Sequence, residues 1–296
     1  MKKKQNRKDR KKPWILLAPL LIFVVGAGIF LYPAMSNLLA EKRQEGVIQT
    51  YQAKVEKAGE KELNDAWKEA REYNENLAGD PVHDPFVMGS GYVLPRNYNQ
   101  VLDISGDGVM GYVEIPKIDV HLPIYHGTGE EVLKKGAGHL EATALPIGGK
   151  YRHSVISAHR GLPSAELFTR LDEMQTGDVF YIHVLDDILA YEVDQIEVIE
   201  PEELEFLVPI QGRDLVTLLT CTPYAVNTHR LLVRGTRISY ERAEDMDNRK
   251  GANTGAKPLW MDSDIIGGMF GIGVLLIIIL VFYFLHKKRK RYGRKS

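Results

Sequence analysis

The 296 residues of the chain include one cysteine, Cys221, which ends the apolar and β-branched run Thr217-Leu218-Leu219-Thr220. A single thiol cannot form an internal disulfide, and no second cysteine exists to share a metal ion. Packing, intermolecular pairing and nucleophilic chemistry remain as its possible roles. Because a free thiol with a pKa of about 8.5 is mostly protonated at pH 7, a nucleophilic role needs a proton-transfer partner and an oxyanion donor.

Arg230 is a candidate for the oxyanion donor. It lies nine residues after Cys221, across a turn. If the two segments that flank the turn are antiparallel neighbouring strands, the thiol and the guanidinium lie at the same end of the strand pair. Arginine is always charged and rigidly forked, so it can hold an oxyanion or a peptide carbonyl. Arg234 and Arg237 compete for this role. Arg230 is favoured because it lies at the strand entrance, although a salt-bridged strand-end arginine is the simpler interpretation of the residue by itself.

The proton-transfer partner must come from among nine histidines. His159 follows the strand-like segment 154–158 and therefore lies at a strand end, where a barrel presents side chains to a ligand. His229 has a similar position, so spacing alone does not choose between them. The sequence contains no HExxH pattern and no cluster of cysteine and histidine, and we expect no metal site.

The segments around these residues predict a mainly β domain over residues 109–243. Short β-branched or aromatic runs, separated by turn residues, are typical of strands. They cover residues 111–115, 120–125, 153–158, 179–184, 190–199, 214–220 and 231–240. A short helix is predicted over 163–174. This pattern favours a closed or nearly closed β-barrel of about eight strands.

Two uncharged apolar runs flank this domain. Residues 14–32 carry no charge over 19 positions, and residues 265–285 carry none over 21. A helix needs roughly 20 apolar residues to cross a bilayer, so both runs are long enough. Eight basic residues lie in 1–12 and seven in 286–296, which leaves 23 basic and 38 acidic residues between the tails, a formal charge of −15. Positive flanks favour the cytoplasm, which predicts cytoplasmic termini and an extracellular middle. The alternative for the first run is a cleaved signal peptide, with a passable cleavage site at Ala34-Met35-Ser36.

The whole chain is therefore divided as follows. Residues 41–79 are rich in Glu, Lys, Ala and Gln, and apolar residues such as Val47, Tyr51 and Val55 recur there at helical spacing, so we expect a helical arm or a solvated stalk. The predicted parts are a basic tail (1–13), a transmembrane helix or signal anchor (14–35), the arm (36–79), a loop region (80–108), the β domain (109–243), a linker (244–264), a second transmembrane helix (265–285) and a basic tail (286–296).

Several motifs, in order along residues 84–240, resemble those of sortases, the extracellular cysteine transpeptidases of Gram-positive bacteria. The run ending in Cys221 matches the Thr-Leu-x-Thr-Cys signature of the family. The segments Cys221-Thr222-Pro223-Tyr224 and 227–235 resemble the class C, pilin-polymerising branch. Ser157-Ala158-His159-Arg160-Gly161 resembles the segment that carries the catalytic histidine, and Asp84-Pro85-Phe86 resembles the lid motif. The resemblance implies a sortase-like closed barrel with two transmembrane helices.

The resemblance also implies a role for each site residue. Cys221 is the implied nucleophile, His159 the acid and base, and Arg230 the donor that stabilises the oxyanion or orients the substrate. Asp84 is implied to pair with Arg230 and Phe86 to pack near Cys221, so that a lid covers the site until substrate displaces it. The residues themselves also allow Asp84 to cap a turn and Phe86 to anchor a loop.

One departure from the family pattern concerns Ala158 and Ala225, which occupy places where glycine is frequent in relatives. We expect this difference to change the local freedom of the backbone slightly and to leave the mechanism intact.

The implied activity is cleavage of a Leu-Pro-x-Thr-Gly-like (LPxTG-like) sorting signal and transfer to a lysine amine of a pilin subunit during pilus assembly. Its implied partners are pilin or surface proteins with that signal, a pilin lysine and, through two spans, membrane lipid. No cofactor and no nucleic acid are expected. The alternatives are a cysteine peptidase that hydrolyses the same signal, a housekeeping sortase that anchors proteins to the cell wall, and a membrane scaffold in which Cys221 is only a small buried hydrophobe.

Overall fold

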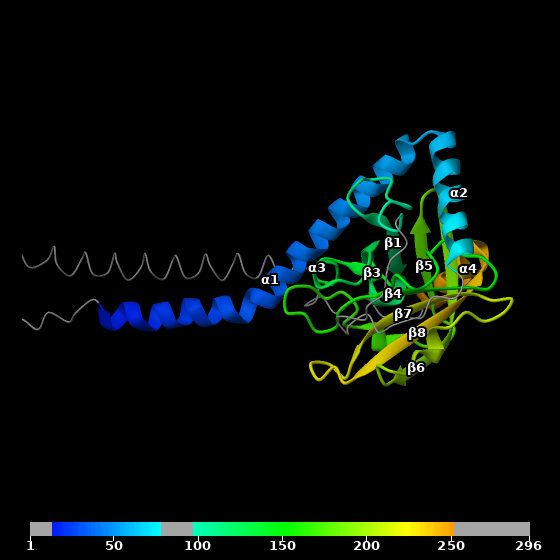
Figure 1. Ribbon diagram of the computed structural model, residues 1–296. Helices are drawn as coiled ribbons and strands as arrows, with labels where there is room; N and C mark the ends of the chain where they lie inside the picture. Colours follow the sequence, from blue (N-terminus) through cyan, green and yellow to red (C-terminus); the bar gives the residue numbers. More distant parts are fainter. Residues whose placement is uncertain (1–13, 78–96, 252–296) are drawn as a thin grey trace, which may run out of the picture.

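A computed structural model describes residues 14–77 and 97–251 of the chain. Eight strands form one closed barrel in the order β1-β2-β3-β4-β7-β8-β6-β5 (Figure 1). The strands are β1 (Val109–Ile115), β2 (Val120–His126), β3 (Ala137–His139), β4 (Arg152–Ser157), β5 (Val179–Val184), β6 (Asp187–Ile199), β7 (Asp214–Thr222) and β8 (His229–Ile238). The β2–β3 and β4–β7 pairs are parallel and the other six are antiparallel. The predicted mainly β barrel is confirmed.

Strand β3 was not predicted because it is three residues long and contains Gly138. That glycine has a packing reason. A Cβ atom at Gly138 would lie 2.2 Å from the carbonyl oxygen of Gly127, so only a residue without a side chain fits this close approach. A strand this short carries no alternation for a sequence pattern to detect.

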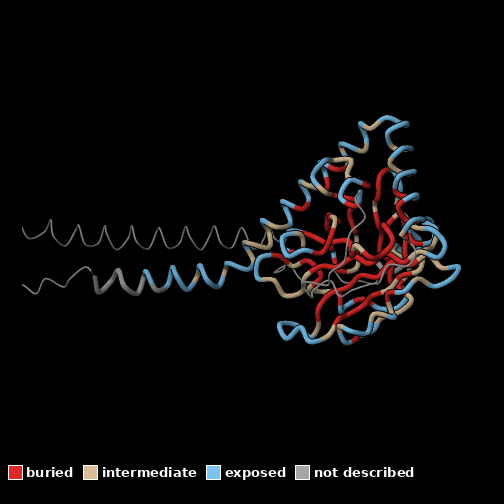
Figure 2. The backbone as a smooth tube through the Cα atoms, viewed as in Figure 1, coloured by how far each residue is buried: buried red, intermediate tan, exposed pale blue. Residues whose placement is uncertain are grey.

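The central strands of the site, β4, β7 and β8, are buried on both faces. On β7, Val216 and Leu218 point into the main core, whereas Leu219 belongs to a second apolar cluster on the opposite face. That second cluster comprises Leu140, Val155, Ile199, Leu207, Leu219 and Leu232, and the 3-10 helix η3 (Leu204–Leu207) packs against it. Figure 2 shows the interior of the domain as largely buried, and β7 is buried at every position except its two ends. Double-sided burial explains why β7 reads as an unbroken apolar run rather than an alternating one.

The helical arm packs against the barrel. Helix α1 (Trp14–Lys57) projects away from the domain at its N-terminal end and lies on β1 and β2 near its C-terminal end (Figure 1). The Tyr51 hydroxyl is buried, donates to the Met110 carbonyl at 3.1 Å and accepts the Leu185 amide at 2.7 Å. After Gly59 the chain turns into α2 (Glu60–Asn76), which is also anchored to the barrel. The arm is therefore a packed element and not a solvated stalk.

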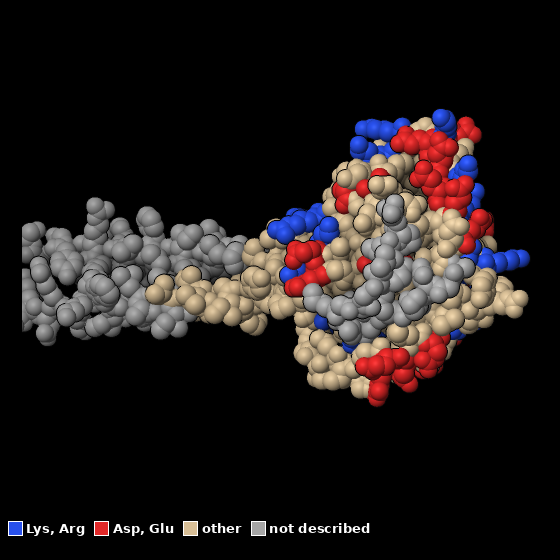
Figure 3. Space-filling model, in the orientation of Figure 1, with Lys and Arg blue, Asp and Glu red and all other residues tan. Residues whose placement is uncertain are grey.

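Helix α1 is, among the described residues, the one helix that is long and apolar enough to cross a membrane. None of its apolar window is buried, and Phe30 is 83% exposed. In Figure 3 acidic side chains gather on the domain, whereas the described part of the projecting helix shows neither acidic nor basic ones. Such a surface fits the first predicted span. The second predicted span, 265–285, lies outside the described residues.

The short helices differ from the prediction in two places. Residues 163–174 do not form the predicted helix; they form a loop with the 3-10 helix η2 (Leu171–Glu173), and Leu167 has a φ of 45°, which no α-helix accommodates. Part of the predicted linker is helical, because α4 (Tyr240–Gly251) packs Ala243 against β5 and β6. The remaining short helices are η1 (Pro116–Ile118) and α3 (Glu130–Leu133).

Candidate active site

Cys221 lies near the C-terminal end of β7, between two neighbouring strands. It is 7% exposed and makes no disulfide. Side chains alternate along a strand, so the thiol shares its face with Leu219 and the second apolar cluster, away from the main core. A thiol in this position is shielded from bulk water at the rim of the barrel.

Arg230 lies directly across from the cysteine. In the antiparallel β7–β8 pair, Cys221 is registered against Arg230. Residues opposite each other in such a pair have Cβ atoms about 5 Å apart on the same face. The arginine is 6% exposed, and its Nη1 donates to the carbonyls of Asn227 at 3.3 Å and His229 at 3.2 Å. The guanidinium is thus held beside the thiol from the backbone of its own turn.

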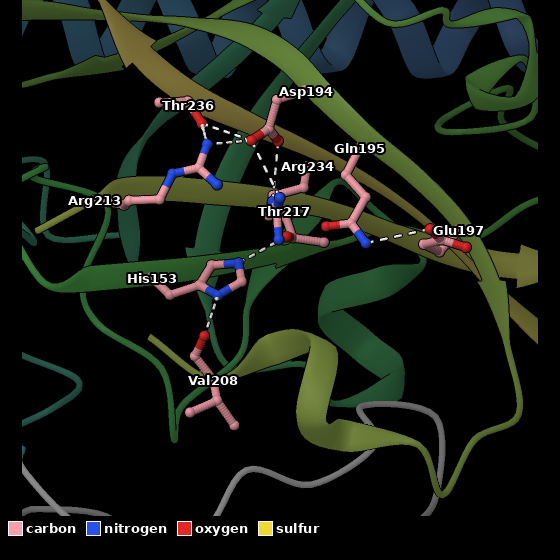
Figure 4. Close-up of polar contacts among 9 residues, drawn as sticks. All are labelled: His153, Asp194, Gln195, Glu197, Val208, Arg213, Thr217, Arg234 and Thr236. Carbon is pink, nitrogen blue, oxygen red and sulfur yellow. Dashed lines mark hydrogen bonds and ion pairs between the residues drawn. The ribbon is translucent and has the colours of Figure 1, made fainter. Parts of the chain in front are cut away.

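The two competing arginines on β8 are engaged elsewhere. Arg234 makes two hydrogen bonds to Asp194, at 3.0 Å and 3.1 Å, as Figure 4 shows. Arg237 lies over the Tyr191 ring and 4.0 Å from the Asp214 carboxylate. Both arginines lie farther along β8 from the thiol than Arg230 does, and each is paired with a carboxylate. Their roles are therefore structural. Arg230 is the arginine that the fold brings to Cys221.

His159 lies just beyond the end of β4, on the other side of β7. The parallel β4–β7 pair registers Ser157 against Leu219, and two residues farther along each chain the register brings His159 beside Cys221. The Ala158 amide donates to the Leu219 carbonyl at 3.2 Å, which continues the alignment past the last strand residue. Cys221 therefore lies between a histidine on one side and an arginine on the other.

The His159 ring is half-buried, and its pKa lies below the ordinary value. Burial is the main cause, because it disfavours the charged ring; the nearby Glu130 carboxylate opposes this effect and the Lys134 ammonium adds to it. A lowered pKa keeps the imidazole neutral near pH 7. In that form it can take a proton from a thiol or an amine.

The other described histidines have structural partners or face elsewhere. His139 and His153 are fully buried, and burial lowers the pKa of each to about 4. The two ring nitrogens of His153 are bonded to the Val208 carbonyl and to Thr217 Oγ1 (Figure 4). His229 is registered against Thr222, so its side chain points to the face opposite Cys221. The fold thus distinguishes His159 on grounds that spacing could not supply.

The turn after Cys221 packs against the segment after His159. Gly161 has a φ of +79°, and a Cβ atom there would lie 2.9 Å from the Tyr224 ring. Glycine is required at this position for both reasons. The close contact keeps the His159 loop against the Cys221 turn.

The family departure at Ala225 has a visible backbone consequence. Ala225 has a φ of +63°, in the left-handed region, whereas Ala158 is buried and is not among the residues with positive φ. Left-handed geometry costs a residue with a side chain roughly 1–2 kcal/mol, and glycine would remove this cost. Glycine also has more conformational entropy to lose on folding, which reduces the gain by roughly 0.5–1 kcal/mol.

We therefore expect Ala225→Gly to raise the free energy of unfolding by about 0.5–1 kcal/mol. The same substitution at Ala158 is the matched control and should lower it, because no backbone strain is relieved there. Urea denaturation of both variants measures the difference. Destabilisation by Ala225→Gly would show that the turn gains nothing from glycine.

The predicted lid residues Asp84 and Phe86 lie outside the described residues, so their roles stay predictions. Within the described parts of the chain no group of three His, Cys, Asp or Glu side chains is placed to hold a metal ion. A hollow of about 430 Å³ lies between α1 and the barrel, lined by residues such as Glu45, His121 and Glu166. It does not include the cysteine, the histidine or the arginine of the site.

Two residues of the quoted motifs received no role of their own in the sequence analysis. Arg160 and Thr222, each next to a site residue in the chain, are hydrogen-bonded to each other at 3.0 Å. They are 62 positions apart, so only the fold reveals the contact. The basic residue directly after His159 was the one available hint.

Comparison with known proteins identifies the fold. Residues 113–238 match the Sortase domain family. Sortase C of Streptococcus pneumoniae is 46% identical in sequence, with a TM-score of 0.59 over 66% of this chain and 97% of that structure. Sortase C1 of Streptococcus agalactiae is 45% identical, with a TM-score of 0.62 over 68% of this chain and 99% of that structure.

More distant relatives belong to another branch. Sortase A of Streptococcus agalactiae is 31% identical over 42% of this chain, and the matched region spans about half, 51%, of that relative. The class C structures are both more similar and almost completely covered. The chain therefore belongs to the sortase family, in its class C branch, and is a sortase transpeptidase.

Proposed function

We propose that this chain is a membrane-anchored, extracellular transpeptidase that cleaves an LPxTG-like sorting signal and joins it to a lysine amine of a pilin subunit. The observation that carries the proposal is the register of three strands, which brings Cys221, His159 and Arg230 together at one end of the barrel. The similar Streptococcus pneumoniae enzyme has been described in terms of pilin substrate specificity, which supports pilins as the substrate class.

The proposed first step is acylation of Cys221. His159 takes the proton of the Cys221 thiol, and the resulting thiolate attacks the carbonyl carbon of the signal's threonine as the electron pair of the carbonyl moves to its oxygen. Arg230, beside the thiol, donates hydrogen bonds to this oxyanion. The intermediate collapses to a thioester when the C–N bond breaks, and His159 gives the leaving glycine amine its proton.

The proposed second step reverses these roles. A lysine amine attacks the thioester carbon, His159 takes a proton from the amine, and the Cys221 thiolate leaves and recovers a proton from His159. The bond that breaks and the bond that forms are both amides, and the thioester conserves the acyl group between them. No external energy source is needed to balance the reaction.

Anchoring and orientation are part of the proposal. The exposed apolar stretch of α1 supports a span near residues 14–35, and the basic residues before it support a cytoplasmic N-terminus. The second span and the lid roles of Asp84 and Phe86 rest on the sequence alone.

Mass spectrometry of the full-length chain in detergent tests the proposed activity. A peptide with a Leu-Pro-x-Thr-Gly signal should leave an acyl adduct on Cys221 after rapid acid quenching. Addition of a lysine-containing pilin peptide should remove the adduct and yield a new amide. If only the free acid appears with and without the amine, the protein is a hydrolase; if Cys221 carries no adduct while amide forms, the assigned nucleophile is wrong.

A further inference from the structure

The chain segments that carry His159 and Cys221 run side by side beyond the last backbone pair of β4 and β7. The ladder between these strands ends where the Ala158 amide reaches the Leu219 carbonyl. From there side chains continue the alignment. Thr220 Oγ1 donates to the Ala158 carbonyl at 2.7 Å, and Arg160 Nη1 donates to Thr222 Oγ1 at 3.0 Å.

These two side-chain bonds flank the proposed reacting pair. One joins the residue before His159 to the residue before Cys221, and the other joins the residues directly after them. His159 itself is in neither strand nor helix. The two bonds hold the chain on both sides of His159 to the chain on both sides of Cys221, and Arg160 provides the one on the loop side.

The Arg160 guanidinium also fastens the far end of the same loop. Its Nε donates to the Thr169 carbonyl at 3.2 Å, and its Nη2 donates to the Asp172 carboxylate. The side chain is only 9% exposed. The loop is closed on itself by the Phe168 amide, which donates to the His159 carbonyl at 3.1 Å. One planar fork thus joins the loop's start, the loop's end and the last residue of β7.

We propose that Arg160 is a positioning residue for transpeptidation, which sets the place of His159 relative to Cys221 through Thr222. The inference rests on the proposed function. The hydrogen bonds of Arg160 go to Thr169, Thr222 and Asp172, so it acts through the chain beside the reacting groups. Displacement of a catalytic group by about 1 Å can cost about 10²-fold in rate, so the loss of this bond should be visible in turnover.

Arg170 provides a matched control on the same loop. Its guanidinium makes a similar set of bonds, two to the Glu173 carboxylate at 2.8 Å and 2.7 Å and one to the Ile118 carbonyl at 3.3 Å. Its partners are all remote in the chain from residues 220–222. A lysine at either position keeps the charge and loses the fork. A general weakening of the loop should therefore affect both variants, and a positioning effect only Arg160→Lys.

The test compares full-length Arg160→Lys, Arg170→Lys, Thr222→Val and the Arg160→Lys, Thr222→Val double variant. We expect Arg160→Lys to lower kcat by about 10- to 100-fold with KM nearly unchanged, and Arg170→Lys to leave kcat nearly unchanged. Thr222→Val should also lower kcat. The double variant should be no slower than Arg160→Lys, because the two substitutions remove the same hydrogen bond between Arg160 and Thr222. Thermal unfolding of each variant corrects for lost stability.

A second readout follows His159 directly. The rate at which a small methanethiosulfonate reagent labels Cys221 is measured against pH, since it reports how much thiolate the neighbouring histidine supports. Arg160→Lys should move this profile toward that of His159→Ala, whereas Arg170→Lys should keep the wild-type profile. A loop that is merely less stable would not change the profile.

Equal losses of kcat in the two arginine variants, or an unchanged pH profile for Arg160→Lys, would overturn the role of Arg160 and leave the proposed function standing. A His159→Ala protein that transfers at the wild-type rate would instead overturn the assignment of His159, and the role of Arg160 with it.

Discussion

Replacement of Cys221 by alanine is expected to lower amide formation between a sorting-signal peptide and a lysine peptide by at least about 10⁴-fold. The reason is that the proposed mechanism holds the acyl group on this thiol, and the remaining members of the site act only on the group that the thiol holds. The measurement is the yield of the joined peptide over time, read by mass spectrometry for the full-length chain.

Ser157 provides the control for this prediction. It lies on the same face as the cysteine, on the neighbouring strand, and its hydroxyl is fully buried without a hydrogen-bond partner. Ser157→Ala removes a nucleophilic atom that substrate cannot reach, so transfer should be nearly unchanged. Both variants should unfold near the wild-type temperature, because each removes one small buried atom. Wild-type transfer by Cys221→Ala would remove the thiol from the mechanism.

Much of the barrel is predictable because most of its strands are long enough for their residue composition to be recognised in the sequence. Strand β5 is dominated by β-branched and aromatic residues, and β7 is a run of leucine and β-branched residues. A nucleophilic role of Cys221 can also be predicted, because a single thiol at a strand end has few possible roles. The antiparallel pairing that brings Arg230 to it follows from a short turn between adjacent strands.

What the sequence could not show depends on contacts between distant residues. The loop 163–174 has the apolar spacing of a helix, yet Asn37 of α1 accepts the Glu166 amide, and Arg160 bonds to Thr169 and to Thr222. These tertiary bonds satisfy backbone and side-chain groups that a helix would otherwise use, and they outweigh the weak local preference. The parallel β4–β7 pairing, which selects His159 among the histidines, likewise joins strands far apart in the chain.

Arg230→Lys is expected to lower kcat/KM for peptide transfer by about 10²–10³-fold, the usual effect of removing one oxyanion donor. A lysine at this position keeps the positive charge, but its single nitrogen cannot lie both beside the carbonyls of Asn227 and His229, where Nη1 lies, and at the place of a second guanidinium nitrogen that donates to the substrate. The loss should fall mainly on kcat, because the oxyanion exists only in the transition state and the intermediate.

Arg234→Lys is the decisive comparison, since Arg234 is on the same strand and face but four residues farther from the turn. It should lose one of its two bonds to Asp194 and lower the free energy of unfolding by about 1–2 kcal/mol, with transfer by the folded protein nearly unchanged. Steady-state kinetics and urea denaturation of the two variants separate catalysis from stability. If both arginines affected kcat equally, a general positive field would explain the result and not a donor aimed at the thioester carbonyl. If only Arg230→Lys does so, the residue registered opposite the cysteine is the one that stabilises the developing charge.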